Sequence, residues 1–255
     1  PDRGDSTAVR KLRHVGAVML GKLAMSGLPG DLPQARNPWN LDHITGGSST
    51  GPGAAVAAGL CMGAIGEDTA GSIRTPASLC GIVGLKPTYG RISRYGLAPL
   101  SWSLDHCGPM TRVVEDAAHL LQATAGYDPD DPTSVRAPVP DYSRALREEV
   151  EGMVIGVPRH YIQECRDRTD PEILTLVDKA ISDLESLGAR VEEVTVPTLK
   201  FATTANAVIY YNEFFTAHRG QVPTLLKSAA TSRRARLYLG ILTGASDYIQ
   251  AQRIR

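Results

Sequence analysis

The chain has 255 residues, of which 42% are hydrophobic, and its 27 Lys and Arg residues balance its 27 Asp and Glu residues. This provides enough apolar material for a sizeable core, and the zero net charge gives no support to a general nucleic-acid binder or to a protein that binds anionic membranes. The longest apolar run, residues 53–62, is far shorter than the ~20 residues that cross a bilayer.

The ends of the chain and its cysteines bear on its origin. Four cysteines lie far apart and form no C-x-x-C pair: Cys61, Cys80, Cys107 and Cys165. With no secretory leader and no N-x-[ST] sequon, this pattern favours a reducing compartment, and we expect a cytoplasmic protein. The chain starts at Pro1 rather than at a methionine and stops within a helical pattern, so we expect an internal fragment of a longer protein.

The first half of the chain alternates helical patterns with glycine-rich loops. A helix is expected over residues 5–13, with Ala8, Val9 and Leu12 on one side, and it should lead into a buried strand at residues 17–20. The further elements expected here are a long loop at 26–51 containing Pro29 and Pro33, an Ala-rich helix at 52–60, a turn at 67–72, a helix at 73–80 and an apolar run at 81–85.

The second half of the chain reads as a helix, a connector and a β-α-β unit. The helix is expected at 111–125, the connector at 127–142, and the β-α-β unit as a strand at 154–157, a helix at 171–187 and a strand at 191–196. Strands that alternate with helices predict an α/β protein. One mixed or parallel sheet covered by helices is the simplest architecture.

Several familiar sites lack support in the sequence. No G-x-x-x-x-G-K-[ST] or H-E-x-x-H motif occurs, and no two of the six histidines are three to five residues apart. Gly51 and Gly53 could open a dinucleotide fingerprint, but Val56 stands where its third glycine belongs. We therefore expect neither a metal nor a cofactor.

Residues 47–51 match G-x-S-x-G, the strand-to-helix turn that exposes a nucleophilic serine. That motif needs a preceding strand, and residues 40–45 do not read convincingly as one. The alternative is that Ser48, Ser49 and Thr50 cap the Ala-rich helix that follows. Taken alone, the motif favours the capping role.

Five longer runs carry a more specific pattern. They are GGSSTG (46–51), DTAGSIRTPAS (68–78), GIVGLKPTYGR (81–91), SLDHCGPMTR (103–112) and VEDAA (114–118). Together they resemble the amidase signature family, and the likeness extends more loosely over residues 5–255. The resemblance implies a single large mixed sheet covered on both faces by helices, incomplete at both ends, and one domain over residues 1–255.

The resemblance also implies a Ser-cisSer-Lys triad. Ser72 matches the nucleophile and Ser48 the bridging serine that relays its proton, with a cis peptide bond expected between Gly47 and Ser48. In the family the lysine base lies further upstream than the 47 residues that precede Ser48. Lys11 and Lys22 do not match it, so we expect the catalytic lysine outside this chain.

The loop before the nucleophile is expected to supply an oxyanion hole from the backbone N–H groups of four residues. These are Thr69, Ala70, Gly71 and Ser72. The family usually has a second glycine where this chain has Ala70, and the added Cβ disfavours a positive φ there. Pro52 also departs from the family pattern, but the first turn of a helix tolerates proline.

Three further side chains are expected to support the site. Asp68 and Arg74 flank the nucleophile and are expected to pair and hold its loop, the alternative being a solvated surface pair. Ser49 either donates a hydrogen bond within the triad or caps the following helix. Lys86 reads as part of a structural turn and is not expected to act in catalysis.

The resemblance implies a serine amidohydrolase that cleaves a carboxylic amide through an acyl-enzyme, giving a carboxylate and ammonia or an amine. The A subunit of a glutamine-dependent amidotransferase, which supplies ammonia for Asp/Glu-tRNA transamidation, is the first alternative. The second is an inactive amidase-like protein, if the lysine is truly absent. Residues 210–219 and 247–253 favour the hydrolase. The expected partner is a small-molecule amide, with a homodimer possible, partner subunits only in the amidotransferase case, and neither a membrane nor direct contact with nucleic acid.

Overall fold

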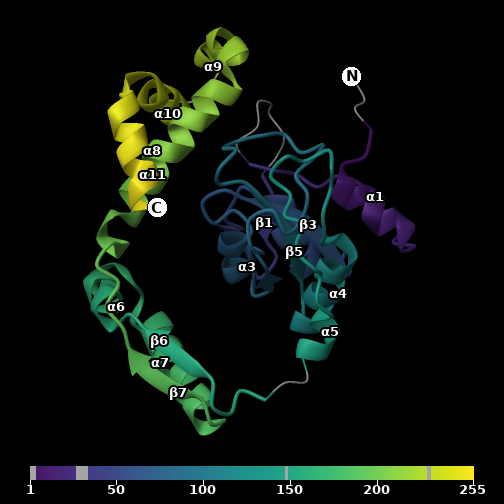
Figure 1. The fold of residues 1–255 in the computed structure, drawn as a ribbon, viewed down its shortest axis with the longest axis vertical. Coiled ribbons are helices and arrows are strands. Elements are labelled where there is room, and N and C mark those ends of the chain that lie inside the picture. The colour runs from purple at the N-terminus through teal and green to yellow at the C-terminus, as the bar shows by residue number, and fades with distance from the viewer. Residues whose placement is uncertain (1–3, 27–33, 147–148, 229–230) are drawn as a thin grey trace. The chain divides into compact units, whose positions relative to one another are not determined.

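The computed structural model describes residues 4–26, 34–146, 149–228 and 231–255 (Figure 1). The strands are β1 (Arg36–Asn37), β2 (Asn40–Ile44), β3 (Gly63–Asp68), β4 (Val83–Gly84), β5 (His106–Thr111), β6 (Val154–Val157) and β7 (Arg190–Glu193). The α-helices are α1 (Thr7–His14), α2 (Thr50–Ala57), α3 (Arg74–Cys80), α4 (Val114–Thr124), α5 (Tyr142–Ala145), α6 (Arg159–Cys165), α7 (Pro171–Ser186), α8 (Leu199–Ala217), α9 (Val222–Ser228), α10 (Thr231–Leu242) and α11 (Ala245–Ile254). Two short 3-10 helices are η1 (Arg166–Arg168) and η2 (Arg219–Gln221).

The chain forms two compact units. Unit 1 comprises Pro1–Leu146 and Val208–Tyr248, and unit 2 comprises Arg147–Ala207 and Ile249–Arg255. Each unit is therefore built from segments that are not continuous in the sequence. That residues 1–255 make up one domain stays a prediction.

A three-stranded antiparallel sheet in the order β3-β5-β4 lies at the centre of unit 1. Strand β3 pairs with β5 from Gly63 opposite Thr111 to Asp68 opposite His106. Successive side chains of a strand point to opposite faces, so Cys107 and Met110 face different layers of helices. This sheet is accordingly covered on both faces.

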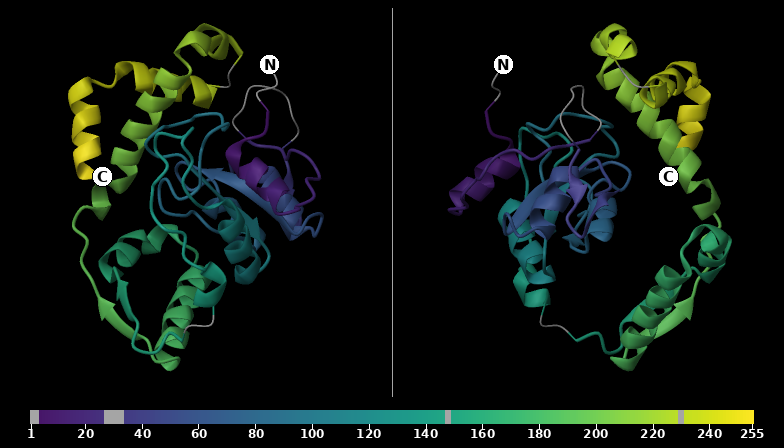
Figure 2. Two further views of the ribbon diagram at one scale, coloured as in Figure 1. Left: turned by 45° about the vertical axis from the view of Figure 1, so that its right-hand side comes forward. Right: turned by 180° about the vertical axis from the view of Figure 1, so that it is seen from behind.

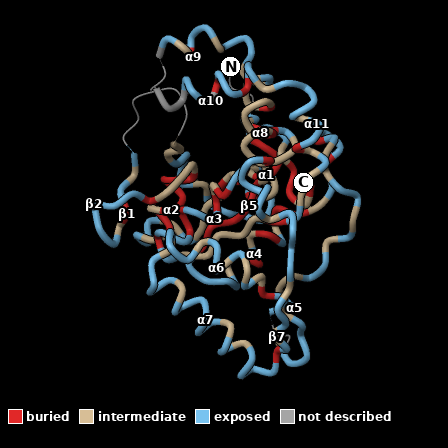
Figure 3. The backbone as a smooth tube through the Cα atoms, turned by 90° about the vertical axis from the view of Figure 1, so that its left-hand side faces the viewer, coloured by how far each residue is buried: buried red, intermediate tan, exposed pale blue. Residues whose placement is uncertain are grey.

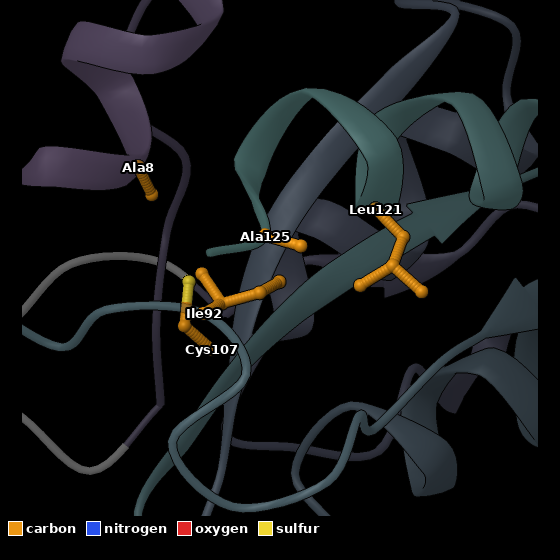
Figure 4. Close-up of a cluster of buried hydrophobic side chains, with 5 residues drawn as sticks. All are labelled: Ala8, Ile92, Cys107, Leu121 and Ala125. Carbon is orange, nitrogen blue, oxygen red and sulfur yellow. The ribbon is translucent and has the colours of Figure 1, made fainter. Parts of the chain in front are cut away.

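The first face packs against α1 and α4. Its core consists of Ala8, Ile92, Cys107, Leu121 and Ala125 (Figure 4). Helix α1 begins after Ser6, whose hydroxyl accepts a hydrogen bond from the N–H of Val9 at 3.4 Å, and it lies beside α4 (Figure 2). The expected helices at 5–13 and 111–125 are confirmed by α1 and α4.

The second face packs against α2 and α3, the two helices that follow the glycine-rich loops. Its core is the buried cluster of Ile73, Ala77 and Met110. Gly66 lies on this face, and a Cβ there would come within 3.0 Å of Met110 Sδ, Ser49 Oγ and Ile73 Cγ1. The close approach that glycine allows brings the start of α2 onto the sheet, and the buried residues gather around these elements (Figure 3).

Unit 2 contains the predicted β-α-β unit. Strands β6 and β7 are parallel, with Val154 opposite Arg190 and Val157 opposite Glu193, and α7 connects them. Helix α7 starts at a proline after the N-cap Asp170, and Gly188, with φ of +93°, follows its end. These local signals match the boundaries expected from the sequence.

The α/β class is confirmed, but two expectations about strands need correction. Residues 17–20 form no strand in the described chain, and Val18 and Leu20 are 84% and 74% exposed, because an apolar run becomes a buried strand only where neighbouring strands cover it. The described strands also pair in three small sheets of two, three and two strands, since β1–β2 is a separate hairpin and β6–β7 belongs to unit 2.

Part of the long loop expected at 26–51, including Pro29 and Pro33, lies outside the described residues. Its described part is not all loop, since it contains the β1–β2 hairpin. No helix among the described residues combines the length and the apolar character needed to cross a bilayer.

Candidate active site

Two serine-bearing loops meet at the starts of α2 and α3. We call residues 45–49 the bridging loop and residues 69–73 the nucleophile loop. The N–H of Ser49 donates to the carbonyl oxygen of Ser72 at 3.2 Å, so the backbones of the two loops are in direct contact. The peptide bond between Gly47 and Ser48 is cis, as the resemblance implied.

Hydrogen bonds fix the backbone of Ser48, whereas its hydroxyl has no described hydrogen-bond partner. Its carbonyl oxygen accepts hydrogen bonds from the N–H of Ser26 at 2.8 Å and of Thr50 at 2.9 Å. Its Oγ is buried and has no hydrogen-bond partner among the described residues. A buried hydroxyl without a partner carries a desolvation cost, which makes Ser48 a candidate for a functional contact.

The lysines near the start of the chain do not supply that contact. Lys11 Nζ donates to the carbonyl oxygens at the end of α4, the shortest being 2.8 Å to Ala125. Lys22 is exposed. That neither lysine is the base stays a prediction.

The hydroxyl of Ser49 takes neither of the two roles considered from the sequence, although its N–H donates to the carbonyl oxygen of Ser72. Ser49 is the N-cap residue of α2, but its side chain makes no capping hydrogen bond. Its Oγ instead accepts from the N–H of Glu67 at 3.2 Å and lies 3.3 Å from the carbonyl oxygen of the same residue. Ser49 is fully buried and attaches the bridging loop to β3.

The first turn of α2 packs against the described segment just before residue 27. Gly51 N–H donates to the carbonyl oxygen of Ala24 at 2.8 Å, and a Cβ at Gly51 would lie 2.5 Å from Ala24 N. Pro52 is buried in this turn, where a helix has no intrahelical acceptor for its N–H groups, so the proline is tolerated as expected.

Asp68 shapes the nucleophile loop. Its carboxylate is 1% exposed and accepts from the N–H of Gly71 at 2.7 Å, of Ile73 at 3.2 Å and of Arg74 at 3.4 Å. Both carboxylate oxygens also receive the Arg74 guanidinium, at 3.0 Å each. The two residues thus form a bidentate pair that organises the loop, rather than a solvated surface pair.

Electrostatics favour the anionic form of Asp68. Burial alone would raise the pKa of this carboxyl, but the hydrogen bonds from Arg74, Gly71 and Ile73 outweigh it and hold the pKa below its ordinary value. The hydrogen bonds that Arg74 donates to Asp68 raise the pKa of Arg74 in turn. The pair is therefore charged at neutral pH.

The backbone of the nucleophile loop revises the expected oxyanion donors. The N–H of Gly71 donates to Asp68, which removes it from the expected set of four. The N–H groups of Thr69, Ala70 and Ser72 have no acceptor among the described residues. No described residue other than glycine has a positive φ, so Ala70 escapes the strained geometry, and Gly71 adopts it with φ of +112°.

Side chains of the β1–β2 hairpin donate hydrogen bonds to the far end of α3, and we call this contact the hairpin clamp. Asn37 Nδ2 donates to the carbonyl oxygen of Leu79 at 2.7 Å, and Trp39 Nε1 donates to that of Cys80 at 2.7 Å. These carbonyls belong to the last turn of the helix, which has no intrahelical donors for them. The β1–β2 hairpin, which leads into the bridging loop, thereby holds the helix that follows the nucleophile loop.

One contact of the nucleophile loop was not foreseen. Thr69 was expected to contribute its N–H, but its hydroxyl also donates to Asp105 Oδ1 at 2.6 Å. Asp105 lies in the fourth of the resembling runs, so the motif contained the residue without indicating its partner. Lys86, whose pKa is lowered by burial and by the nearby Arg74, donates to the carbonyl oxygen of Pro87 at 3.1 Å, in agreement with a structural turn.

The half-buried Glu67 lies on the opposite face of β3 from Asp68. Burial, and then the negative charge of Asp105, raise the pKa of Glu67 to about 7. Glu67 pairs across the sheet with Cys107, whose pKa is raised to about 12 by burial and then by Glu67. Within the described ranges, no group of three His, Cys, Asp or Glu side chains is arranged to hold a metal ion.

Several known proteins are similar to this chain in sequence and in fold. The A subunit of the glutamyl-tRNA(Gln) amidotransferase of Moorella thermoacetica is 51% identical over 208 residues, which cover 79% of this chain and 42% of that protein. The structure of the corresponding A subunit from Thermotoga maritima has a TM-score of 0.84 at 35% identity and covers 98% of this chain and 57% of its own. The peptide amidase of Stenotrophomonas maltophilia has a TM-score of 0.78 at 33% identity and covers 98% of this chain and 58% of its own.

The matches cover most of this chain but only about half of each similar protein. The chain spans less than half the length of the curated relatives that it matches. The family model named Amidase matches residues 1–243, nearly the whole of this chain. On this match and on its relatives, the chain belongs to the amidase signature family.

Proposed function

We propose that this chain carries the two serines of a serine amidohydrolase, with Ser72 as nucleophile and Ser48 as proton relay. The observation that carries the proposal is the contact between the two loops, in which Ser49 N–H bonds to the carbonyl oxygen of Ser72 while the buried Ser48 Oγ has no described partner. A serine hydroxyl needs an adjacent base to act as a nucleophile, and a second hydroxyl can pass its proton on.

In the proposed reaction, Ser72 Oγ forms a bond to the amide carbon and gives its proton to Ser48. The resulting oxyanion is stabilised by the N–H groups of Thr69, Ala70 and Ser72. The C–N bond then breaks as the leaving nitrogen takes a proton through Ser48. Water adds to the acyl-enzyme carbon, Ser72 regains its proton, and the carboxylate leaves. The base that starts this sequence is the family's lysine, which we place outside this chain.

A second candidate function has its own support. The curated relatives at 46–51% identity are the A subunits of glutamyl-tRNA(Gln) amidotransferases. A protein of this kind would release ammonia from glutamine together with partner subunits. An inactive amidase-like protein is the third candidate. For each of them we propose a cytoplasmic protein that needs neither metal nor cofactor, with a homodimer as a further possibility.

The test is fluorophosphonate labelling, followed by peptide mass spectrometry, of this chain extended upstream so that it contains the family's lysine. We expect phosphonylation at Ser72, its loss in Ser72→Ala, and slower labelling in Ser48→Ala. Ser78→Ala is the matched control, because Ser78 is an exposed serine on α3. Labelling of Ser72 no faster than of Ser78 would support the inactive protein.

Ammonia release separates the two active candidates. A hydrolase should release ammonia or an amine from simple amides without a partner. An amidotransferase subunit should release ammonia from glutamine only when partner subunits are added. The assay therefore compares both substrates with and without the partner subunits of a relative.

A further inference from the structure

Asp105 joins the nucleophile loop to a turn at residues 100–105. One of its oxygens, Oδ1, accepts from Thr69 Oγ1 at 2.6 Å and from Ser101 N–H at 3.0 Å. The other, Oδ2, accepts from the N–H groups of Leu100 at 2.8 Å and Ser101 at 2.9 Å. A single carboxylate therefore fixes two segments that lie 36 residues apart along the chain.

Thr69 is the point at which this carboxylate reaches the loop. Asp68 holds the second half of the loop through the N–H groups of Gly71 and Ile73. Asp105 holds its first residue through the hydroxyl of Thr69, which is 7% exposed. The N–H groups of Thr69, Ala70 and Ser72, which have no described acceptor, thus lie in a loop that two carboxylates, the buried Asp68 and the half-buried Asp105, fix from both ends.

Glu213 on α8 holds the same turn from the other side. Its carboxylate accepts from Ser101 Oγ at 2.5 Å, Ser103 N–H at 2.9 Å, Ser103 Oγ at 2.7 Å and Tyr248 OH at 2.6 Å. The side chain is 7% exposed. Burial alone would raise the pKa of Glu213, but these hydrogen bonds outweigh it and keep the pKa below its ordinary value. Glu213 is therefore an anion that fixes Ser101 and Ser103.

We propose that Asp105 is a positioning residue of the nucleophile loop, and that Glu213 sets the position of Asp105 by holding the turn at residues 100–105. Asp105 acts through the Thr69 hydroxyl, and its effect is to keep the free N–H groups of the loop in place before a substrate binds. This inference rests on the proposed function, because it assigns the loop to Ser72 as nucleophile. Preorganised donors stabilise a developing oxyanion most when they need not move during the reaction.

The first experiment measures amide hydrogen exchange by NMR in the full chain. Thr69→Val removes the hydroxyl with little change of shape, and Thr69→Ser keeps the hydroxyl. We expect Thr69→Val to speed exchange of the Gly71, Leu100 and Ser101 N–H groups by about fivefold, since a hydrogen bond contributes about 1 kcal/mol. Thr69→Ser should restore rates close to those of the unsubstituted chain.

The matched control is Thr111→Val, which removes a buried hydroxyl from the far end of β5. Thr111 Oγ1 donates to the carbonyl oxygen of Val113 at 2.8 Å and contacts neither loop. We expect this variant to leave exchange in the nucleophile loop unchanged. The proposal is overturned if Thr69→Val leaves these rates unchanged, or if Thr111→Val raises them equally.

The second experiment tests Glu213 with Glu213→Gln. Its control is Asp128→Asn, because Asp128 is another buried carboxylate that accepts two hydroxyl donors, from Thr7 and Ser93, both at 2.6 Å. We expect faster exchange at Ser101 and Gly71 in Glu213→Gln only. Equal effects of the two variants would show general loosening and would overturn the role of Glu213.

The rate at which a fluorophosphonate labels Ser72 links positioning to chemistry. Thr69→Val should slow labelling and Thr69→Ser should restore it. If the unsubstituted protein that contains the family's lysine is not labelled at Ser72, the proposed function fails, whereas the exchange pattern still decides whether Asp105 and Glu213 position the loop. The two failures are therefore distinguishable.

Discussion

At the scale of single residues, the site depends on a buried carboxylate whose charge is offset by hydrogen bonds and an ion pair. Asp68 receives three backbone N–H groups and a guanidinium, which together offset the cost of removing its charge from water. Removing such a charge leaves the donors without partners. The residues around Ser72 should therefore be sensitive to changes that alter charge and preserve shape.

We expect Asp68→Asn to lower the free energy of unfolding by about 2 to 4 kcal/mol at pH 7, because it leaves Arg74 and the loop N–H groups poorly paired. The folded pKa of Asp68 lies below its value of 3.8 in the unfolded chain, so its contribution is present above that value and is lost as the pH falls through the folded pKa. Urea titrations at pH 7 and pH 3 should show the difference between variant and unsubstituted chain shrinking at pH 3.

The control for this prediction is Asp5→Asn. Asp5 pairs with Arg13 at 2.7 Å, but both side chains are well exposed, so the loss should be below about 1 kcal/mol. A loss for Asp68→Asn as small as that for Asp5→Asn would contradict the structural role of the buried pair.

The contribution of Glu67 to stability should change with pH in the opposite direction to that of Asp68, because burial and then Asp105 raise the folded pKa of Glu67 to about 7 from 4.5. The unfolded chain loses this proton above pH 4.5 while the folded chain keeps it to about pH 7, so stability falls as the pH rises between these values. The side chain introduced by Glu67→Gln cannot ionise. Relative to the unsubstituted chain, the free energy of unfolding of this variant should rise by about 1 to 3 kcal/mol between pH 4.5 and pH 8. Urea titrations across this range measure the gain.

Glu115→Gln removes an exposed carboxylate on α4 and is the control for Glu67. If the two glutamine variants change stability with pH in the same way, the environment of Glu67 is not the cause. A gain confined to Glu67→Gln would support the burial described here.

The hairpin clamp on α3 matters at the scale of elements. Asn37→Ala removes the donor to the carbonyl oxygen of Leu79 and the acceptor for Trp39 N–H at 3.0 Å. We expect the free energy of unfolding to fall by about 1 to 3 kcal/mol in urea titrations, because the last turn of α3 loses a hydrogen-bond donor. Asn40→Ala is the control, since Asn40 Oδ1 accepts a local hydrogen bond from the N–H of Asp42 at the exposed tip, and losses of equal size would contradict the clamp.

The elements themselves could be predicted from local signals, and their long-range contacts could not. Helix α7 follows from Pro171 at its start and Gly188 after its end, and both act within a few residues. No such signal links Thr69 with Asp105, because which carboxylate reaches a hydroxyl 36 residues away is decided by the packing of the sheet. The strand expected at residues 17–20 was wrong for the same reason, since pairing depends on neighbours that the local pattern does not contain.

Ser49 shows the same limit within the candidate site. Ser49 follows Ser48 in the sequence, but the two backbone groups that bond to its hydroxyl both belong to Glu67 on β3. The family resemblance implied the cis peptide bond, and the positions of Asp68 and Arg74 on either side of the expected nucleophile predicted their pairing. It did not indicate that the same carboxylate takes the N–H of Gly71.

The whole molecule can be probed through its thiols, since all four cysteines are free. Cys80 and Cys107 are buried, and burial raises the pKa of both, whereas Cys61 and Cys165 are half-buried. We expect iodoacetamide to modify Cys61 and Cys165 first in the native protein and all four in urea, as mass spectrometry would measure. Rapid native modification of Cys107 would contradict the core of unit 1.

The order in which the segments of unit 1 are synthesised separates Ser101 from its carboxylate partner. Glu213 is made 112 residues after Ser101, once the β-α-β unit of unit 2 has been synthesised. At about 5–20 residues per second, the turn at residues 100–105 waits roughly 6 to 22 s for Glu213 to be made. During translation the hydroxyls of Ser101 and Ser103 must therefore remain hydrated, and the segment around Ser72 reaches its final form only after α8 emerges.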